Sequence, residues 1–285
     1  MKAAQARILL TGGSGGIGAA AAARFVNAGA SVMLVGRTPE KLSTQAHALS
    51  RDAAPGTPRV QWCTADLTQA AELEELGEIA AEWGCNVLVH CAGAPSFGPL
   101  ESLDPVDMAQ VLHTNLLAPM LLTRALLPHL RRLQRAQVIC VGSVLGCIGL
   151  PGYSVYSATK FGLRGFAEAL RRELGDSSVR VQYLGPRSTR TPFNSAGVEA
   201  YNRATGTASD TPEAVAQAML ELLESEATER FLGFPEAWAV RLNGLAPARM
   251  DAAFVKHRNC LSAAAKADAA PGATSPTTAF QGLES

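Results

Sequence analysis

The chain has 285 residues, 47% of them hydrophobic, and its 25 Lys and Arg residues balance its 25 Asp and Glu residues. This length is sufficient to bury the core of one α/β domain. The balanced charge argues against nucleic acid or an acidic surface as a partner, so we expect a small molecule instead.

Six cysteines are present, but no two form a CxxC pair, and several lie in apolar runs such as residues 138–141. A thiol in such a run packs as a small hydrophobe, so we expect neither disulfides nor a metal site. Reduced cysteines are typical of a cytoplasmic protein. No segment reaches the roughly 18 consecutive apolar residues that indicate a membrane span.

Short apolar or β-branched runs alternate with longer helical patterns up to about residue 184. The predicted strands are residues 7–10, 31–35, 60–63, 87–91, 137–141 and 179–184. The predicted helices are residues 19–28, 40–51, 70–82, 106–132 (with a bend or early stop near Pro128), 154–174 and 212–224. The alternation predicts βαβ units, and therefore an α/β fold with a doubly wound parallel sheet, the Rossmann fold, and helices on both faces.

The later part of the chain is less regular. Residues 189–211 are polar and turn-rich, which is typical of a functional lid or binding segment. We predict one Rossmann-fold domain over residues 1–260, with an atypical C-terminal extension from about residue 229. The remaining residues, 261–285, are rich in Ala, Pro, Thr and Ser, a composition that predicts a disordered tail.

Apolar and basic side chains are interleaved within residues 237–258 of this extension. The pattern is compatible with an amphipathic helix that covers a pocket, joins a partner subunit or rests on a membrane surface. We favour packing on its own domain or on a second copy over membrane contact.

A glycine-rich turn, Thr11-Gly12-Gly13-Ser14-Gly15-Gly16-Ile17-Gly18, follows the first predicted strand and opens the first helix. Glycines let the backbone turn sharply and approach a pyrophosphate, which the free N–H groups and the positive end of the helix dipole then stabilise. The alternative is an ordinary strand-to-helix loop. The candidate cofactor contacts in this turn are Gly12, Ser14, Gly15, Gly16, Ile17 and Gly18.

The turn resembles the fingerprint of the short-chain dehydrogenase/reductase superfamily: Thr-Gly, three residues, Gly, one residue, Gly. Thr11, Gly12, Gly16 and Gly18 match this fingerprint. Because Gly15 also supplies the middle glycine of the longer branch, which includes epimerases and dehydratases, the turn alone does not choose the branch. The resemblance covers about residues 7–224 and implies a nicotinamide-dependent oxidoreductase, which we expect to form a homodimer or homotetramer.

The end of the second predicted strand bears on the choice of cofactor. A carboxylate there would bind the ribose hydroxyls of NAD, whereas an arginine would bind the extra phosphate of NADP. Gly36-Arg37 stands at this position, so NADP(H) is favoured over NAD(H), with a solvated surface arginine as the alternative. Against this, Gly15 stands where NADP-preferring relatives often carry a basic residue.

The resemblance implies further cofactor contacts after the third and fourth strands. Asp66 and Leu67 correspond to the adenine contact, although Asp66 is also a candidate cap for a helix near Thr68. Ala92 and Gly93 match the family segment after the fourth strand. His90-Cys91 replaces the usual two asparagines, and we interpret His90 as a packed structural histidine.

Tyr156 and Lys160 lie four residues apart on one face of a predicted helix. A nearby cation stabilises a phenolate and lowers the phenol pKa, which makes the tyrosine usable as an acid or base near neutral pH. Ser143 ends the fifth predicted strand, at the edge of the sheet where ligands bind. The resemblance implies that Ser143 hydrogen-bonds the reacting oxygen and that Asn115 holds a water linking Lys160 to solvent. It also implies that Tyr156 and Lys160 contact the cofactor, with Lys160 bonding the nicotinamide ribose.

After the sixth strand, residues 186–192 resemble the family segment that holds the nicotinamide carboxamide. The resemblance implies Pro186, Thr189, through its backbone, and Thr191 as contacts. Arg187 replaces the usual glycine, and we interpret it as a solvated or structural arginine rather than a substrate anchor.

These observations predict an NADPH-dependent reduction of a hydrophobic ketone or aldehyde to an alcohol, by hydride transfer with Tyr156 as the acid/base. The alternatives are an epimerase or dehydratase of the longer branch and a non-enzymatic nucleotide sensor. Chain length, Ala92-Gly93 and Asn115 argue against the first alternative, and the presence of both Tyr156 and Lys160 argues against the second. Several apolar residues near these motifs favour a hydrophobic substrate, with the alternative that they belong to the core: Leu145, Ile148, Leu150 and Phe193.

Overall fold

The computed structural model describes residues 1–51, 60–234 and 236–268. A seven-stranded sheet runs through it in the order β3-β2-β1-β4-β5-β6-β7, and each neighbouring pair of strands is parallel. The strands are β1 (Arg7–Thr11), β2 (Ser31–Gly36), β3 (Val60–Thr64), β4 (Val87–His90), β5 (Ala136–Val141), β6 (Val179–Gly185) and β7 (Glu229–Phe231). The predicted doubly wound parallel sheet is confirmed.

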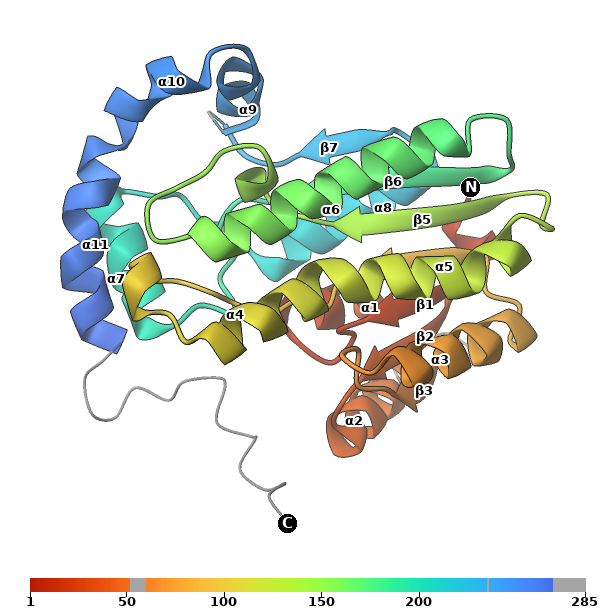
Figure 1. Cartoon of the computed structure of the whole chain (residues 1–285). Coiled ribbons are helices and arrows are strands. Elements are labelled where there is room, and N and C mark those ends of the chain that lie inside the picture. The colour runs from red at the N-terminus through yellow and green to blue at the C-terminus, as the bar shows by residue number, and fades with distance from the viewer. Residues whose placement is uncertain (52–59, 235, 269–285) are drawn as a thin grey trace.

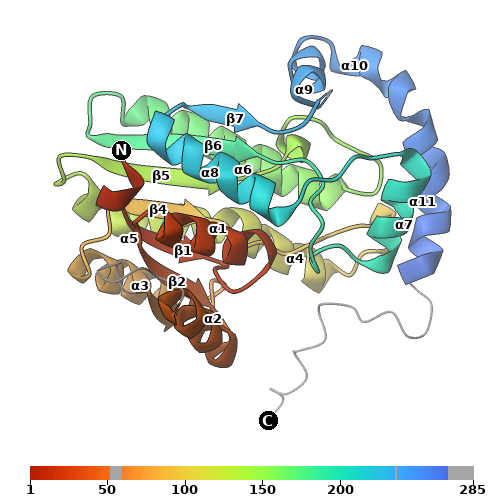
Figure 2. The same ribbon diagram turned by 180° about the vertical axis from the view of Figure 1, so that it is seen from behind.

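Helices pack on both faces of the sheet, as Figures 1 and 2 show from opposite sides. One face carries α1 (Gly16–Asn27), α2 (Pro39–Arg51) and α8 (Pro212–Ser225), which share an apolar layer with the strands. The other face carries α3 (Ala70–Glu82), α5 (Ala118–Leu130) and α6 (Ser154–Glu173) around a second layer. Because the central strands are covered on both faces, they are continuous apolar runs, which made them visible in the sequence.

The helix predicted over residues 106–132 is divided in the structure. It consists of α4 (Pro105–Leu112), a π-helical segment (His113–Leu117) and α5, which ends shortly after Pro128. The sequence did not indicate the π-helical segment. Such segments are frequent at functional sites, and this one contains Asn115.

The strand β7 and the helix α7 (Ala196–Thr205) were missed by the sequence analysis. The strand β7 has only three residues, two of them charged, so it shows no apolar run. The segment predicted as a polar loop, residues 189–211, contains the helix α7, so the loop prediction is wrong there. The Ser195 side chain accepts a hydrogen bond from the Val198 N–H and caps the start of this helix.

The C-terminal extension continues from β7 as α9 (Glu236–Leu245), α10 (Pro247–Met250), a 3-10 turn (Asp251–Phe254) and α11 (Val255–Asp268). In both views α11 lies side by side with α7. The predicted disordered tail is therefore wrong for residues 261–268, which are helical, and residues 269–285 lie outside the described residues. Of the helices described, none is both long and apolar enough to cross a membrane.

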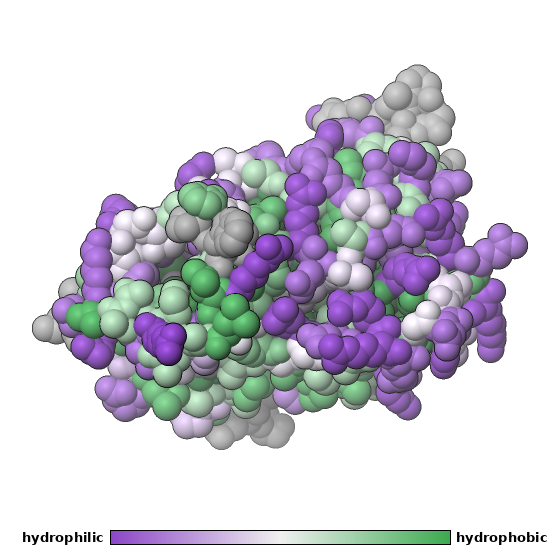
Figure 3. Space-filling view, turned by 90° about the horizontal axis from the view of Figure 1, so that it is seen from above, coloured by the Kyte–Doolittle hydropathy of each residue, from purple (hydrophilic) through white to green (hydrophobic). Residues whose placement is uncertain are grey.

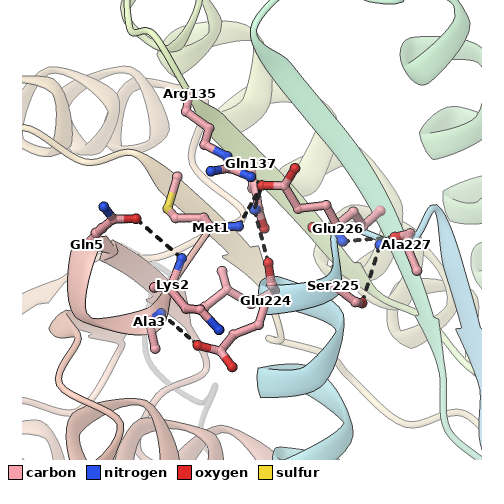
Figure 4. A network of polar contacts seen from close by, with 12 residues as sticks. Met1, Lys2, Ala3, Gln5, Arg135, Gln137, Glu224, Ser225, Glu226 and Ala227 are labelled. Carbon is pink, nitrogen blue, oxygen red and sulfur yellow. Dashed lines mark hydrogen bonds and ion pairs between the residues drawn. The ribbon is translucent and has the colours of Figure 1, made fainter.

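A polar network joins the start of the chain to the far end of the sheet (Figure 4). The Glu226 carboxylate accepts hydrogen bonds from the Met1 amino group at 2.6 Å, from Arg135 Nε at 2.6 Å and from Gln137 Nε2 at 3.1 Å. These hydrogen bonds, that of Arg135 above all, hold the pKa of Glu226 down to about 2. The network lies at the end of the sheet opposite to the pocket described below. It stabilises the sheet on which that pocket is built.

Candidate active site

A pocket of about 1760 Å³ opens at the carboxyl ends of the strands, which is where ligands bind in doubly wound sheets. Every residue predicted to contact cofactor or substrate lines this pocket except Asn115. The predicted residues that line it are Gly12, Ser14, Gly15, Gly16, Ile17, Gly18, Arg37, Asp66, Leu67, Ala92, Gly93, Ser143, Tyr156, Lys160, Pro186, Thr189 and Thr191. The fold thus brings together segments that are far apart in the sequence.

The glycine turn is packed so closely that side chains are excluded at particular positions. Gly12 and Gly16 have φ of +69° and +41°, values that L side chains rarely adopt. A Cβ on Gly18 would overlap the Gly12 carbonyl oxygen, and one on Gly12 would lie 2.8 Å from Ala92 Cα. By contrast, a Cβ on Gly15 would have no atom within 4 Å.

The turn is held against two other parts of the pocket. The Thr11 hydroxyl accepts hydrogen bonds from the backbone N–H groups of Cys91 and Ala92, both at 3.1 Å. A Cβ on Gly16 would lie 3.0 Å from Thr191 Cγ2. The chain after β4 and the chain after β6 therefore meet at the glycine turn.

Two basic side chains, the predicted Arg37 and also Lys41, lie near the end of β2. Arg37 at the end of β2 and Lys41 in α2 are exposed and line the same part of the pocket as Ser14. Neither forms a hydrogen bond or ion pair with the part of the chain that is described, so both are available to an anion. Lys41 was missed, although its place four residues after Arg37 was visible in the sequence.

Asp66 makes hydrogen bonds close to the start of a helix, as the capping alternative in the sequence analysis expected. Its Oδ1 accepts hydrogen bonds from the Thr68 N–H at 2.9 Å and from the Thr68 hydroxyl at 2.8 Å, just before α3 begins at Ala70. The carboxylate thus shapes the turn into α3. The adenine contact of Asp66 and Leu67 stays a prediction.

Tyr156 and Lys160 lie in the first turns of α6, as predicted. Lys160 Nζ is 5.5 Å from the centre of the Tyr156 ring and donates a hydrogen bond to the Val141 carbonyl at 3.2 Å. Lys160 is only 4% exposed, and this burial lowers its pKa to about 8. The side chain therefore carries its positive charge at neutral pH and loses it in mildly alkaline solution.

The phenol of Tyr156 behaves differently from the sequence prediction. Burial raises its pKa, and a hydrogen bond with the Ser143 side chain offsets this only in part. Burial is the largest effect on this pKa, because desolvation disfavours the charged phenolate. Tyr156 consequently keeps its proton at neutral pH and is suited to donate it.

The position of Ser143 depends on a residue that the sequence analysis read only as part of a strand. Tyr183 in β6 is 2% exposed; its hydroxyl donates to the Ser143 carbonyl at 2.9 Å and accepts from the Ser143 N–H at 3.0 Å. A Cβ on either Gly142 or Gly146 would overlap this hydroxyl. The sequence did contain a signal for this contact. Tyr183 lies in a strand that was predicted from an apolar run, and a buried tyrosine hydroxyl usually has a hydrogen-bond partner.

Asn115 is buried in the π-helical segment and does not line the pocket. Its Oδ1 accepts from the Ala94 N–H at 2.7 Å, and its Nδ2 donates to the Ala94 carbonyl at 2.9 Å and to the Thr159 hydroxyl at 3.3 Å. These contacts brace the loop after β4 against α6. The water-holding role implied by the resemblance stays a prediction.

The interpretations of His90 and Arg187 agree with the contacts. His90 Nε2 lies 2.8 Å from the Thr123 hydroxyl, and burial lowers the His90 pKa to about 3, so the ring is neutral and packed. Arg187 donates to Asp210 Oδ1 from Nε at 3.0 Å and from Nη2 at 2.7 Å, and its Nη1 lies 3.4 Å from Glu236. It is a structural arginine that ties the segment after β6 to α9.

The sequence profile described as short chain dehydrogenase matches residues 6–202. Dehydrogenase/reductase SDR family member 7B of Bos taurus is 30% identical over 251 residues, which cover 84% of this chain and 77% of that protein. The chain belongs to the short-chain dehydrogenase family. It is accordingly an oxidoreductase that acts on CH–OH or carbonyl groups.

Two further similarities place this short-chain dehydrogenase among its relatives. 3-Ketodihydrosphingosine reductase of Bos taurus is 32% identical over 190 residues, 66% of this chain, but the match spans only 57% of that relative's length. A solved short-chain dehydrogenase from Sphingobium yanoikuyae in complex with NADPH superposes with a TM-score of 0.72 at 27% identity. The superposition covers 86% of this chain and 94% of that one.

The glycine turn of this short-chain dehydrogenase permits a matched test. Gly18→Ala should lower the stability by about 2–4 kcal/mol, because the new Cβ must displace the Gly12 carbonyl, whereas Gly15→Ala should cost less than about 1 kcal/mol. Urea unfolding followed by circular dichroism measures both. Equal losses in the two variants would contradict the packing described for the turn.

Proposed function

We propose that this short-chain dehydrogenase reduces a hydrophobic ketone or aldehyde to an alcohol with NADPH. The observation that carries the proposal is the grouping of Ser143, Tyr156 and Lys160 at one end of an extended pocket. The name of 3-ketodihydrosphingosine reductase supports a ketone as the substrate class. The NADPH complex of the Sphingobium yanoikuyae relative supports the cofactor.

The glycine turn fits the phosphates of a dinucleotide. Gly12 and Gly16 adopt backbone conformations that favour glycine, and α1 begins there with Gly15 at its N-cap, so its first N–H groups face the pocket. The turn residues Gly12, Ser14, Gly15, Gly16, Ile17 and Gly18 would hold the pyrophosphate.

Arg37 and Lys41 would hold the phosphate that distinguishes NADP from NAD, because both cations line the pocket without a partner in the described part of the chain. The adenine would lie near Asp66 and Leu67. At the other end, Ala92, Gly93, Pro186, Thr189 and Thr191 would surround the nicotinamide. When bound, the cofactor supplies a hydride to the carbonyl carbon of the substrate.

The proton that the carbonyl oxygen of the substrate takes up would come from a side chain of the protein. Tyr156 holds it on the phenol oxygen at neutral pH and would donate it to the carbonyl oxygen as that oxygen gains negative charge. Ser143 Oγ accepts from the Leu145 N–H at 3.1 Å, which leaves the hydroxyl proton of Ser143 free to point to the same oxygen. The Lys160 ammonium would stabilise the phenolate that remains on Tyr156.

The rest of the pocket suits an apolar substrate. Leu145, Ile148, Leu150 and Phe193, which the sequence singled out, all line it. Burying the apolar part of a ketone against such residues would contribute roughly 25 cal/mol for each Å² removed from water. The homodimer or homotetramer and the cytoplasmic location stay predictions.

The direct test of the function is Tyr156→Phe with a panel of ketones of increasing chain length. The variant should lose turnover by about a hundredfold or more, because the proton donor is gone, while NADPH binds with nearly the same Kd. NADPH oxidation and NADPH fluorescence titration measure the two quantities. Turnover retained in the variant, or no ketone reduced by the wild type, would refute the proposal.

The cofactor preference has its own test in Arg37→Ala. Loss of a charge-assisted contact should raise KM for NADPH by about tenfold or more and leave KM for NADH nearly unchanged. NADH serves as the internal control because it lacks the added phosphate. Equal effects on the two cofactors would show that Arg37 does not recognise this phosphate.

The pH dependence follows from Lys160. Its pKa of about 8 lies below the ordinary value, so the cation is present below that pH and is lost as the pH rises through it. We expect kcat for reduction to fall above about pH 8. Cys91→Ala should keep this fall, because burial raises the pKa of the Cys91 thiol to about 12. A rate that stays constant to about pH 10 would show that the Lys160 charge is not needed.

A further inference from the structure

The C-terminal extension forms a wall of the pocket at the end away from the glycine turn. We call residues 236–261 the C-terminal arch, because they pass from α9 above β7 to α11 beside α7 (Figures 1 and 2). Ala239, Met250, Ala253, Phe254 and His257 of the arch line the pocket. Figure 3 shows the molecule from above, where hydrophobic and hydrophilic residues are interspersed on the surface.

Contacts at both ends attach the arch to the rest of the protein. Asn243 Nδ2 in α9 donates to the Cys147 carbonyl at 2.8 Å, and Lys256 Nζ in α11 donates to the Thr205 carbonyl at 2.9 Å. Leu261 packs so closely on the Gly152 backbone that a Cβ there would lie 2.6 Å from its Cδ1. The arch is therefore a fixed part of the pocket.

A line of aromatic rings leads from the reacting end of the pocket to the arch. The centre of the Tyr153 ring is 6.2 Å from that of Tyr156 and 6.0 Å from that of Tyr201. The ring of His257 follows, 5.5 Å from Tyr201, with Phe254 a further 5.7 Å away. All five residues line the pocket, so an elongated apolar molecule held at Tyr156 would extend along these rings.

The contacts of Tyr201 determine which nitrogen of His257 carries the proton. The Tyr201 hydroxyl lies 3.1 Å from the Pro151 carbonyl and 2.9 Å from His257 Nδ1. A carbonyl oxygen only accepts, so the tautomer that satisfies both contacts has the Tyr201 hydroxyl donating to the Pro151 carbonyl and Nδ1–H of His257 donating to Tyr201. Burial and the nearby Lys256 lower the His257 pKa, which keeps the ring neutral. Nε2 is then an acceptor, and it has no hydrogen-bond partner among the described residues.

We propose that His257 Nε2 accepts a hydrogen bond from a hydroxyl or N–H group of the substrate, at the end of the aromatic line remote from Tyr156. This inference rests on the proposed ketone reduction and narrows its substrate class. The substrate is an apolar ketone that also carries a hydrogen-bond donor far from its carbonyl. An acceptor among aromatic rings discriminates strongly, because a ketone that lacks the donor would cover Nε2 and leave it without a hydrogen bond.

The test compares two series of ketones of equal chain length. The ketones of one series end in a methyl group, and those of the other carry one hydroxyl at increasing distance from the carbonyl. At saturating NADPH, the wild type should prefer one hydroxylated position over the methyl-terminated ketone by about tenfold in kcat/KM. His257→Asn should abolish the preference, because the amide nitrogen can still donate to Tyr201 but no acceptor replaces Nε2. The readout is the ratio of kcat/KM for the hydroxylated and the methyl-terminated ketone within each variant, and an unchanged Kd for NADPH, measured by fluorescence titration, shows that the variant is folded.

Arg258→Ala, a change of an exposed neighbour on α11, is the matched control and should keep the preference. If ketones are reduced but no hydroxyl position is preferred, or if the preference survives in His257→Asn, the role of His257 is wrong while the proposed function stands. If neither series is reduced, the proposed function fails and the inference fails with it.

Discussion

The arrangement of the active site depends on one buried contact, the pair of hydrogen bonds between the Tyr183 hydroxyl and the backbone of Ser143. This contact connects β6 to the chain just after β5, and it requires glycine at positions 142 and 146. It satisfies the N–H group of a residue that has left the sheet, and it adds a second hydrogen bond to the Ser143 carbonyl, which also accepts from the Gly146 N–H at 3.0 Å. The side chain of Ser143 is thereby held near Tyr156, whose pKa it lowers against the larger effect of burial.

Burial then determines how the neighbouring groups ionise. It disfavours the charged form of every group, so it raises the pKa of the Tyr156 phenol and lowers that of Lys160 to about 8. A protonated phenol beside an ammonium is the combination that the reduction of a carbonyl needs. The same pocket extends past Tyr153 to the C-terminal arch, so the proposed site of proton transfer and the proposed hydrogen-bond acceptor His257 belong to different parts of the chain.

The sequence was sufficient for features that repeat or that follow from chain topology. Buried strands such as β2 are apolar runs, and the carboxyl ends of parallel strands meet at one edge, which placed Ser143 near Tyr156. Features that depend on distant contacts were not predictable. Tyr183 meets Ser143 across 40 positions, α7 has only ten residues and buries only Gly197, Val198 and Tyr201, and the effect of burial on Tyr156 exists only in the folded protein.

The central claim is that Tyr183 acts on the reaction through the hydroxyl of Ser143. A double-mutant cycle of Tyr183→Phe and Ser143→Ala, with kcat for ketone reduction as the readout, tests it most directly. We predict that Tyr183→Phe lowers kcat in the wild type but has almost no further effect once Ser143 is alanine. Equal reductions of kcat in both backgrounds would contradict the account, because Tyr183 would then act independently of Ser143.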